Sequence, residues 1–163
     1  MDKFSKKLGR AFHPETLALG LGYDPMLSEG AVKPPVFLTS TFQFKSSGDG
    51  KEFFQAAYGI KDLPQGKSMG LIYSRLNNPN LQILEERIAA WDKTDKAAAF
   101  ASGMGAISTT MFALLRPGDV VISVRPVYGG THYLLEHILP EMGVDARFVK
   151  AGDGAAAEMK RVA

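Results

Sequence analysis

The stretch from Lys96 to Leu115 constrains the fold most, because it predicts a short apolar strand, a glycine turn and an apolar helix in direct succession. The turn is Ser102-Gly-Met-Gly105. A strand that passes through a tight turn into a helix is the repeating unit of parallel α/β sheets. Val120–Val124 and Ala146–Val149 are further strand-like runs, the first typical of a strand covered on both faces. We therefore predict an α/β fold with a mainly parallel sheet.

The individual elements can be placed from caps, turns and apolar spacing. Asn78 can cap a helix whose first turn accepts Pro79. The apolar face of that helix is expected to comprise Leu81, Leu84, Ile88 and Trp91. A buried strand is expected at Lys96–Ala101, helices at Met104–Leu115 and Thr131–Leu139, and a Pro-Gly turn at Arg116–Asp119.

Residues 1–70 differ from the rest of the chain. Frequent glycine and proline leave room only for short helical turns, around Glu15–Gly20 and Lys51–Tyr58. We interpret 1–70 as an extended, irregular N-terminal arm that lies on another subunit, because it has no core of its own. Residues 71–163 would then begin a larger domain that is incomplete, since three parallel strands leave a bare edge and Glu158–Ala163 resembles a helix just begun.

Composition narrows the class of protein. The 163 residues are 45% hydrophobic, which suits one ordinary core, and the net charge of +2 argues against nucleic-acid or membrane partners. The absence of cysteine excludes disulfides and cysteine zinc sites, and no metal site is expected. Ala97–Leu115 carries no charge but is only weakly apolar, so a bilayer span is not expected. Without a signal peptide, a soluble, cytoplasmic protein is the expectation.

Two stretches could bind a phosphorylated ligand. The glycine turn would open a helix with outward N–H groups and a positive dipole end, although a merely tight turn explains the glycines equally well. Tyr128 follows the next strand and should lie at the same sheet edge, where its ring suits a planar phosphorylated cofactor; packing under the following helix is the alternative. Tyr73 and Arg75 could also bind a phosphate, unless Arg75 pairs with Glu85 or Glu86.

These motifs resemble the pyridoxal-phosphate (PLP) enzymes of cysteine and methionine metabolism, which include cystathionine γ-synthase, cystathionine γ-lyase, methionine γ-lyase and the homoserine-ester sulfhydrylases. The resemblance runs from about Thr16 to the end of the chain. It rests on Pro34-Pro-Val-Phe-Leu-Thr-Ser-Thr-Phe42, Tyr73-Ser-Arg75, Asn78-Pro79, Ala101-Ser-Gly-Met104, Arg116-Pro-Gly-Asp119 and Tyr128-Gly-Gly130, in the family's order. It implies the N-terminal part of a type I PLP-dependent transferase fold, in a homo-oligomer (dimer or tetramer).

The resemblance also implies an activity and site residues. The enzyme would be a lyase or transferase that catalyses γ- or β-elimination or replacement on cystathionine, methionine or an O-acyl-homoserine. Tyr73 and Arg75 would bind the PLP phosphate in the neighbouring subunit's site. Gly103 and Met104 would offer backbone amides to the phosphate, with Ser102 beside them. Tyr128 would stack on the pyridine ring and act as a catalytic residue in proton transfer.

The sequence departs from the family in one decisive place. The family forms its Schiff base with a lysine that follows a small or hydroxyl residue and Thr, whereas Lys150 and Lys160 follow Val149 and Met159. We therefore expect the 163-residue chain alone to be inactive, as a fragment would be. Gly130 also stands where methionine γ-lyases usually carry a cysteine.

Two other functions remain open from the sequence. Gly103, Gly105 and Ser108 imitate a dinucleotide fingerprint, and Arg125 would tolerate a 2′-phosphate, so an NADP-binding oxidoreductase domain is the main alternative. The expected acidic residue is poorly matched, because Asp119 precedes its strand. A non-catalytic remnant that associates with intact paralogues is the third reading.

Overall fold

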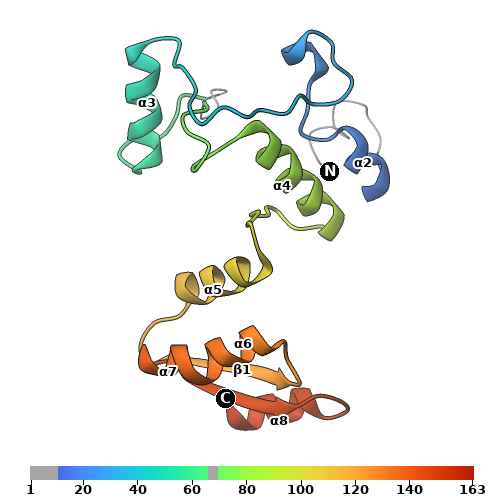
Figure 1. Cartoon of the computed structure of the whole chain (residues 1–163), viewed down its shortest axis with the longest axis vertical. Helices are drawn as coiled ribbons and strands as arrows, with labels where there is room; N and C mark the ends of the chain where they lie inside the picture. The colour runs from blue at the N-terminus through green and yellow to red at the C-terminus, as the bar shows by residue number, and fades with distance from the viewer. Residues whose placement is uncertain (1–10, 66–69) are drawn as a thin grey trace. The chain divides into compact units, whose positions relative to one another are not determined.

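A computed structural model describes residues 11–65 and 70–163, which fall into two compact units (Figure 1). The first unit ends at Ala99 and the second runs from Phe100 to Ala163. Each unit has its own secondary structure and buried residues, so each is described by itself.

Within its described residues, the first unit contains α2 (Pro14–Gly20), the 3₁₀ helix η1 (Pro25–Ser28), α3 (Ser47–Ala57) and α4 (Pro79–Asp92). α4 begins as the sequence predicts, whereas α3 begins at Ser47, four residues before the helical turn expected at Lys51–Tyr58. The Asn78 side chain caps α4 by accepting from the N–H of Asn80, and Pro79 stands in the first turn. Lys93 ends the helix in the left-handed region. The predicted turns near Glu15 and Lys51 are thus confirmed as helices.

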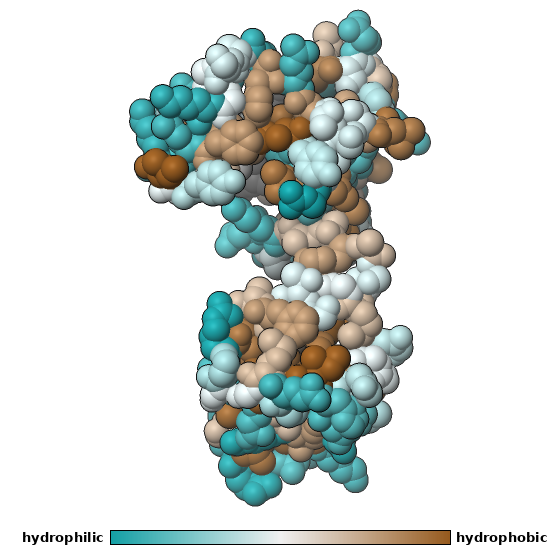
Figure 2. All heavy atoms as spheres, turned by 60° about the vertical axis from the view of Figure 1, so that its left-hand side comes forward, coloured by the Kyte–Doolittle hydropathy of each residue, from teal (hydrophilic) through white to brown (hydrophobic). Residues whose placement is uncertain are grey.

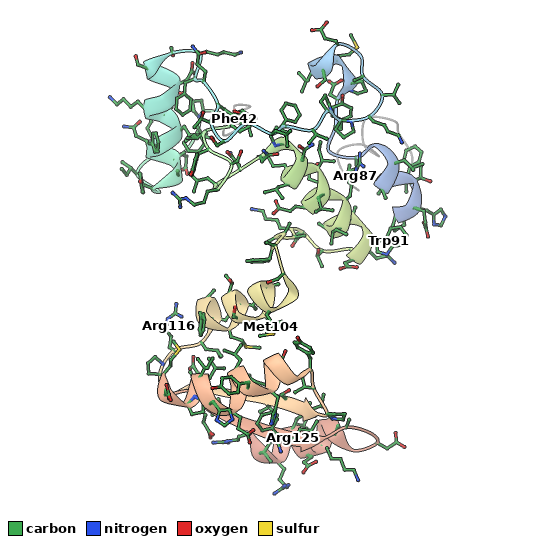
Figure 3. The ribbon with its side chains drawn as sticks, in the orientation of Figure 1. Phe42, Arg87, Trp91, Met104, Arg116 and Arg125 are labelled. Atoms are coloured by element: carbon green, nitrogen blue, oxygen red, sulfur yellow. The ribbon has the colours of Figure 1, made fainter. Side chains whose placement is uncertain are left out.

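α2 packs against α4 in this unit. The buried side chains at this end are Leu17, Ile83 and Ala89, with exposed fractions of 5–6%. Arg87 extends from α4 to the end of α2, where it donates to the carbonyls of Leu21 and Leu19 at 3.1 and 3.3 Å (Figure 3). These bonds satisfy C-terminal carbonyls of α2 that have no partner inside the helix.

The predicted apolar face of α4 is not buried. Its members remain 41–51% exposed, and they are Leu81, Leu84, Ile88 and Trp91. The side of the helix that packs within the unit carries Ile83 and Ala89 instead. Apolar side chains are also exposed along the preceding arm, and Figure 2 shows brown, apolar patches on the surface. The arm members above 75% exposure are Leu19, Met26, Leu27, Val32, Val36 and Leu38.

The second unit has the predicted α/β order. Its elements are α5 (Gly103–Leu114), β1 (Val120–Arg125), α6 (Gly129–Tyr133), the π-helical turn η2 (Leu134–Ile138), α7 (Leu139–Glu141), β2 (Asp145–Lys150) and α8 (Ala155–Val162). β1 and β2 pair in parallel, from Val120 opposite Asp145 to Arg125 opposite Lys150. The fold is therefore mixed α/β with a small parallel sheet.

The core of this unit lies between one face of the sheet and the helices that follow β1. Leu134, Leu135, Leu139 and Val144 are 0–3% exposed. Partly buried residues of α5 and of both strands pack on them, and these are Met104, Ile107, Met111, Leu115, Val121, Ala146 and Phe148. On the other face, Arg147 donates to the carbonyl of Val162 in α8. Helices thus lie against both faces of the sheet, and the inner residues of β1, predicted to be covered on both faces, are partly buried.

The prediction of a strand before α5 is wrong. Residues 96–101 do not form a buried strand: these residues are exposed or half-buried and lack a ladder partner, and the N–H of Ala99 bonds to Glu85 Oε1 at 2.9 Å instead. The described part of the chain therefore has two parallel strands, not three. The helix expected at Thr131–Leu139 is present, within a helical stretch from Gly129 to Glu141. Its middle widens into η2, which was not predicted, since Pro140 cannot donate to the carbonyl four residues earlier and its ring clashes there. Among the described helices, none combines the length and the apolar character that a bilayer crossing needs.

Candidate functional site

The first turn of α5 presents two unused amide donors. Ser102 caps the helix: its Oγ accepts the N–H of Gly105 at 3.0 Å, and its carbonyl accepts the N–H of Ala106 at 3.0 Å. Within the described residues, no hydrogen bond uses the N–H of Gly103 or of Met104. α5 has 12 residues, so the positive end of its dipole lies at the same two groups. Two parallel donors at a helix start suit a phosphate.

Tyr128 lies beside this helix start, as predicted. It follows β1 and immediately precedes α6. Its ring and the Met104 side chain meet at Gly130, where an added Cβ would lie 2.9 Å from Tyr128 Cε1 and 3.0 Å from Met104 Sδ. The Thr131 hydroxyl lies 3.8 Å from the same sulfur, and Figure 3 shows Met104 on the side of α5 that faces α6. The glycine turn and the aromatic ring therefore share one rim of the sheet.

The Tyr128 side chain is not packed under α6, because the residue is 70% exposed. The exposure excludes the alternative that this tyrosine serves only to pack beneath the following helix. Among the described residues its hydroxyl has no hydrogen-bond partner, so both a ring face and a phenol are available to a ligand. The rim thus combines two N–H donors, a helix dipole and an aromatic plate, which fits a planar ring that bears a phosphate.

Tyr73 and Arg75 belong to the first unit and stand on an exposed turn. Tyr73 forms an isolated antiparallel bridge with Thr41, and the Arg75 guanidinium lies 5.4 Å from the Tyr73 ring centroid. The ion pair with Glu85 or Glu86 is not formed, and within 11–65 and 70–163 no carboxylate pairs with Arg75. Its charge is therefore available for an anion.

An asparagine network holds this turn in place. The buried Asn78 donates to the Phe37 carbonyl at 3.2 Å and to Ser74 Oγ at 3.1 Å while it caps α4. Asn80 accepts the Phe37 N–H at 2.7 Å and donates to the Pro35 carbonyl at 2.8 Å. The sequence predicted only the cap; the density of asparagine in Asn77-Asn-Pro-Asn80 was the available sign of a network that anchors this turn to 35–42.

Arg125 does not have the role that the NADP alternative needs. Its Nη2 lies 3.3 Å from Glu136 Oε1, and its guanidinium stacks over Phe148 at 3.9 Å from the ring centroid. A guanidinium with these two partners is already engaged within its own unit. The charge that a 2′-phosphate would require is thus partly neutralised.

The described residues include no metal site, and the large groove of the first unit does not contain the predicted phosphate-binding residues. No group of three metal-binding side chains is found among them. An open groove of about 810 Å³ lies in the first unit and contains neither Tyr73 nor Arg75. Its walls are largely apolar, with Phe37, Phe42, Phe44 and Phe53 among them. Within the second unit, the groups suited to a phosphorylated ring therefore lie at the rim formed by Met104 and Tyr128.

Comparison with known proteins extends this description. The family described as "Cys/Met metabolism PLP-dependent enzyme" matches residues 15–161. An L-methionine gamma-lyase of Pseudomonas putida is 41% identical over 143 residues, which are 88% of this chain and 33% of that protein. A sulfhydrylase of Fusarium oxysporum, FUB7, is 38% identical over 85% of this chain and 30% of its own.

Solved structures agree with the sequence relatives. A Campylobacter jejuni protein whose crystal structure carries N′-pyridoxyl-lysine-5′-monophosphate superposes with a TM-score of 0.78 at 28% identity, over 94% of this chain and 35% of that one. MetB of Corynebacterium glutamicum gives a TM-score of 0.69 at 25% identity, over 93% and 36%. The chain spans about a third of the length of the curated relatives it matches.

Proposed function

Because this chain belongs to the Cys/Met metabolism PLP-dependent enzyme family, we propose that it is the part of such an enzyme that binds the cofactor's phosphate and one face of its ring. The observation that carries the proposal is the shared rim, where the side chain of Met104, in the first turn of α5, meets the ring of Tyr128 at Gly130. Because the family uses PLP, we favour PLP over NADP as the ligand of this glycine turn.

The residues divide into two groups under this proposal. Gly103 and Met104 donate backbone N–H groups to the phosphate, and Ser102 fixes the helix start that aims them. Tyr73 and Arg75 bind the phosphate in the site of a neighbouring subunit, so the active form is a homo-oligomer. This assignment is supported by the exposed turn, whose guanidinium has no carboxylate partner among the described residues. On this view 1–70 serve as an arm and 71–163 begin the cofactor-binding domain.

When bound, PLP would supply an electron sink that stabilises negative charge at the substrate's Cα. Tyr128 would offer its ring face to that ring, and its phenol is the chain's candidate for moving a proton near the substrate amine. The substrate would be an amino acid with a leaving group on its γ or β carbon, such as cystathionine, methionine or an O-acyl-homoserine. The named relatives, an L-methionine gamma-lyase and an O-acetyl-L-homoserine sulfhydrylase, support that class.

The chain alone is expected to bind without turning over. Lys150 and Lys160 do not follow the small-residue–Thr pattern of the family's lysine. Activity is therefore proposed for the form of the enzyme that includes such a lysine. Release of a 2-oxoacid from methionine by the purified 163-residue chain would contradict this part of the proposal.

Binding can be tested with pyridoxamine 5′-phosphate, because this ligand cannot condense with surface lysines as PLP does. The control ligand is pyridoxamine, which lacks the phosphate. The variant is Gly103→Pro, since proline suits the first helical position, Ser102 is already extended, and a Cβ at Gly103 meets nothing within 4 Å. This change deletes one N–H donor and leaves the helix. The matched control is Ser47→Pro, at the same position of α3 behind the equally extended Ser46 cap.

Calorimetric titration should show that the phosphorylated ligand binds at least about tenfold more tightly than pyridoxamine, because a hydrogen bond to a charged group contributes about 1.5–3 kcal/mol. Gly103→Pro should weaken its binding about tenfold, and Ser47→Pro should not change it. Equal affinity for the two ligands would refute the proposed phosphate site.

A further inference from the structure

The Glu136 carboxylate contacts residues on both sides of Tyr128 in the sequence. Its Oε1 lies 3.3 Å from Arg125 Nη2, and its Oε2 lies 2.6 Å from His132 Nε2. Arg125 is the last residue of β1, three positions before Tyr128, and His132 is in α6, four positions after it. The turn between β1 and α6, which contains Tyr128, lies between these two contacts in the sequence. The Glu136 carboxylate therefore links the two ends of this turn.

Phe148 of β2 contacts both partners of Glu136 from the sheet. The Arg125 guanidinium stacks over its ring at 3.9 Å, and the His132 ring lies 5.3 Å from its centroid. Phe148 itself packs on the buried core of the unit. The cation and the imidazole are therefore held by a rigid element as well as by Glu136. Figure 3 shows Arg125 at the sheet, beside these elements.

The tyrosine depends on its backbone for its position. It is 70% exposed, and its ring approaches Gly130 with one edge. Its carbonyl accepts the N–H of His132 at 2.9 Å, so the residue that Glu136 holds is bonded directly to Tyr128. A change at Glu136 would be transmitted to the tyrosine through this bond and through the end of β1.

We propose that Arg125, His132 and Glu136 form a clasp that positions Tyr128 against the cofactor ring. These three are positioning residues, because none of them needs to touch the cofactor. That the clasp serves cofactor binding rests on the proposed function. That Glu136 holds Tyr128 in place does not, and it can be tested with no ligand present.

The test uses the full chain labelled with 3-fluorotyrosine and followed by ¹⁹F NMR. Tyr128→Phe assigns its resonance among those of the five tyrosines, and Tyr23 and Tyr58 in the first unit serve as internal references. Glu136→Ala should shift and broaden the Tyr128 signal by more than its own linewidth, and Glu136→Gln, which retains an acceptor for Arg125, should restore it in part. The matched control is Glu141→Ala, an exposed glutamate in α7 outside the clasp.

Circular dichroism should be unchanged in all variants, because Glu136 is 41% exposed. Binding of pyridoxamine 5′-phosphate should weaken about twofold to fivefold in Glu136→Ala, the range expected when a solvated ion pair is lost. A Tyr128 signal that is the same in Glu136→Ala and in the unsubstituted chain, or that moves equally in Glu141→Ala, would overturn the clasp. If the unsubstituted chain binds no pyridoxamine 5′-phosphate, the proposed function fails, and the fluorine signal still decides whether the clasp exists.

Discussion

Removing the Asn78 side chain should lower the stability of the first unit, because this buried side chain makes several hydrogen bonds. The residue is 8% exposed, caps α4 through the Asn80 N–H, and donates to the Phe37 carbonyl and to Ser74 Oγ. Loss of an N-cap costs about 1 kcal/mol, and each of two partly buried hydrogen bonds contributes about 1 kcal/mol. We therefore expect Asn78→Ala to lower the free energy of unfolding by about 2–3 kcal/mol.

Urea denaturation followed by tryptophan fluorescence measures this cost directly. Trp91 is the single tryptophan and lies in α4, so its signal reports on the first unit. Asn78→Ser retains a capping oxygen and loses both donated bonds, and should cost about 1–2 kcal/mol. Gln82→Ala, at an exposed position of the same helix, is the control and should cost nothing. If Asn78→Ala unfolds within about 0.5 kcal/mol of the unsubstituted chain, the network does not stabilise the Arg75 turn.

Three further results are expected. Gly130→Ala should weaken binding of pyridoxamine 5′-phosphate several-fold in a calorimetric titration, because its Cβ would meet Tyr128 and Met104 at 2.9 and 3.0 Å. The control is Gly129→Ala, whose Cβ has nothing within 4 Å and which should bind normally. Equal affinities of the two variants would contradict the close approach of Tyr128 and Met104 at Gly130. Ser102→Ala should cost about 1 kcal/mol in urea unfolding followed by circular dichroism, whereas Ser102→Asp should restore stability and yet weaken phosphate binding by charge repulsion. Leu135→Ala, at a residue 1% exposed, should cost about 2–5 kcal/mol in the same assay, against less than about 0.5 kcal/mol for Leu114→Ala at 73% exposure.

Local signals in the sequence predicted most of the second unit. The glycine turn, the Pro-Gly turn at 116–119 and the two apolar runs that became β1 and β2 each depend on neighbouring residues only. Their order led us to expect Tyr128 and the start of α5 close together, because parallel strands share a carboxyl edge. The two do lie close together, although the strand expected before α5 is absent from the described residues. Family motifs then suggested a ligand for that rim.

Contacts between distant residues explain what the sequence did not reveal. Lys96–Ala101 is apolar enough for a strand, but a strand needs a neighbour, and Ala99 bonds to Glu85 instead. Periodicity identified the apolar face of α4 without indicating whether anything covers it, and its members are about half exposed. The clasp around Glu136 joins three polar residues whose spacing alone had no distinctive pattern.

An amide NMR titration of the full chain with pyridoxamine 5′-phosphate tests the proposed phosphate site most directly. We expect the largest shifts at the N–H groups of Gly103 and Met104 and around Tyr128. Pyridoxamine, which lacks the phosphate, should leave the N–H groups of Gly103 and Met104 unchanged. Shifts confined to other surfaces, or equal responses of Gly103 to both ligands, would contradict the claim that this helix start and this tyrosine bind one phosphorylated ring.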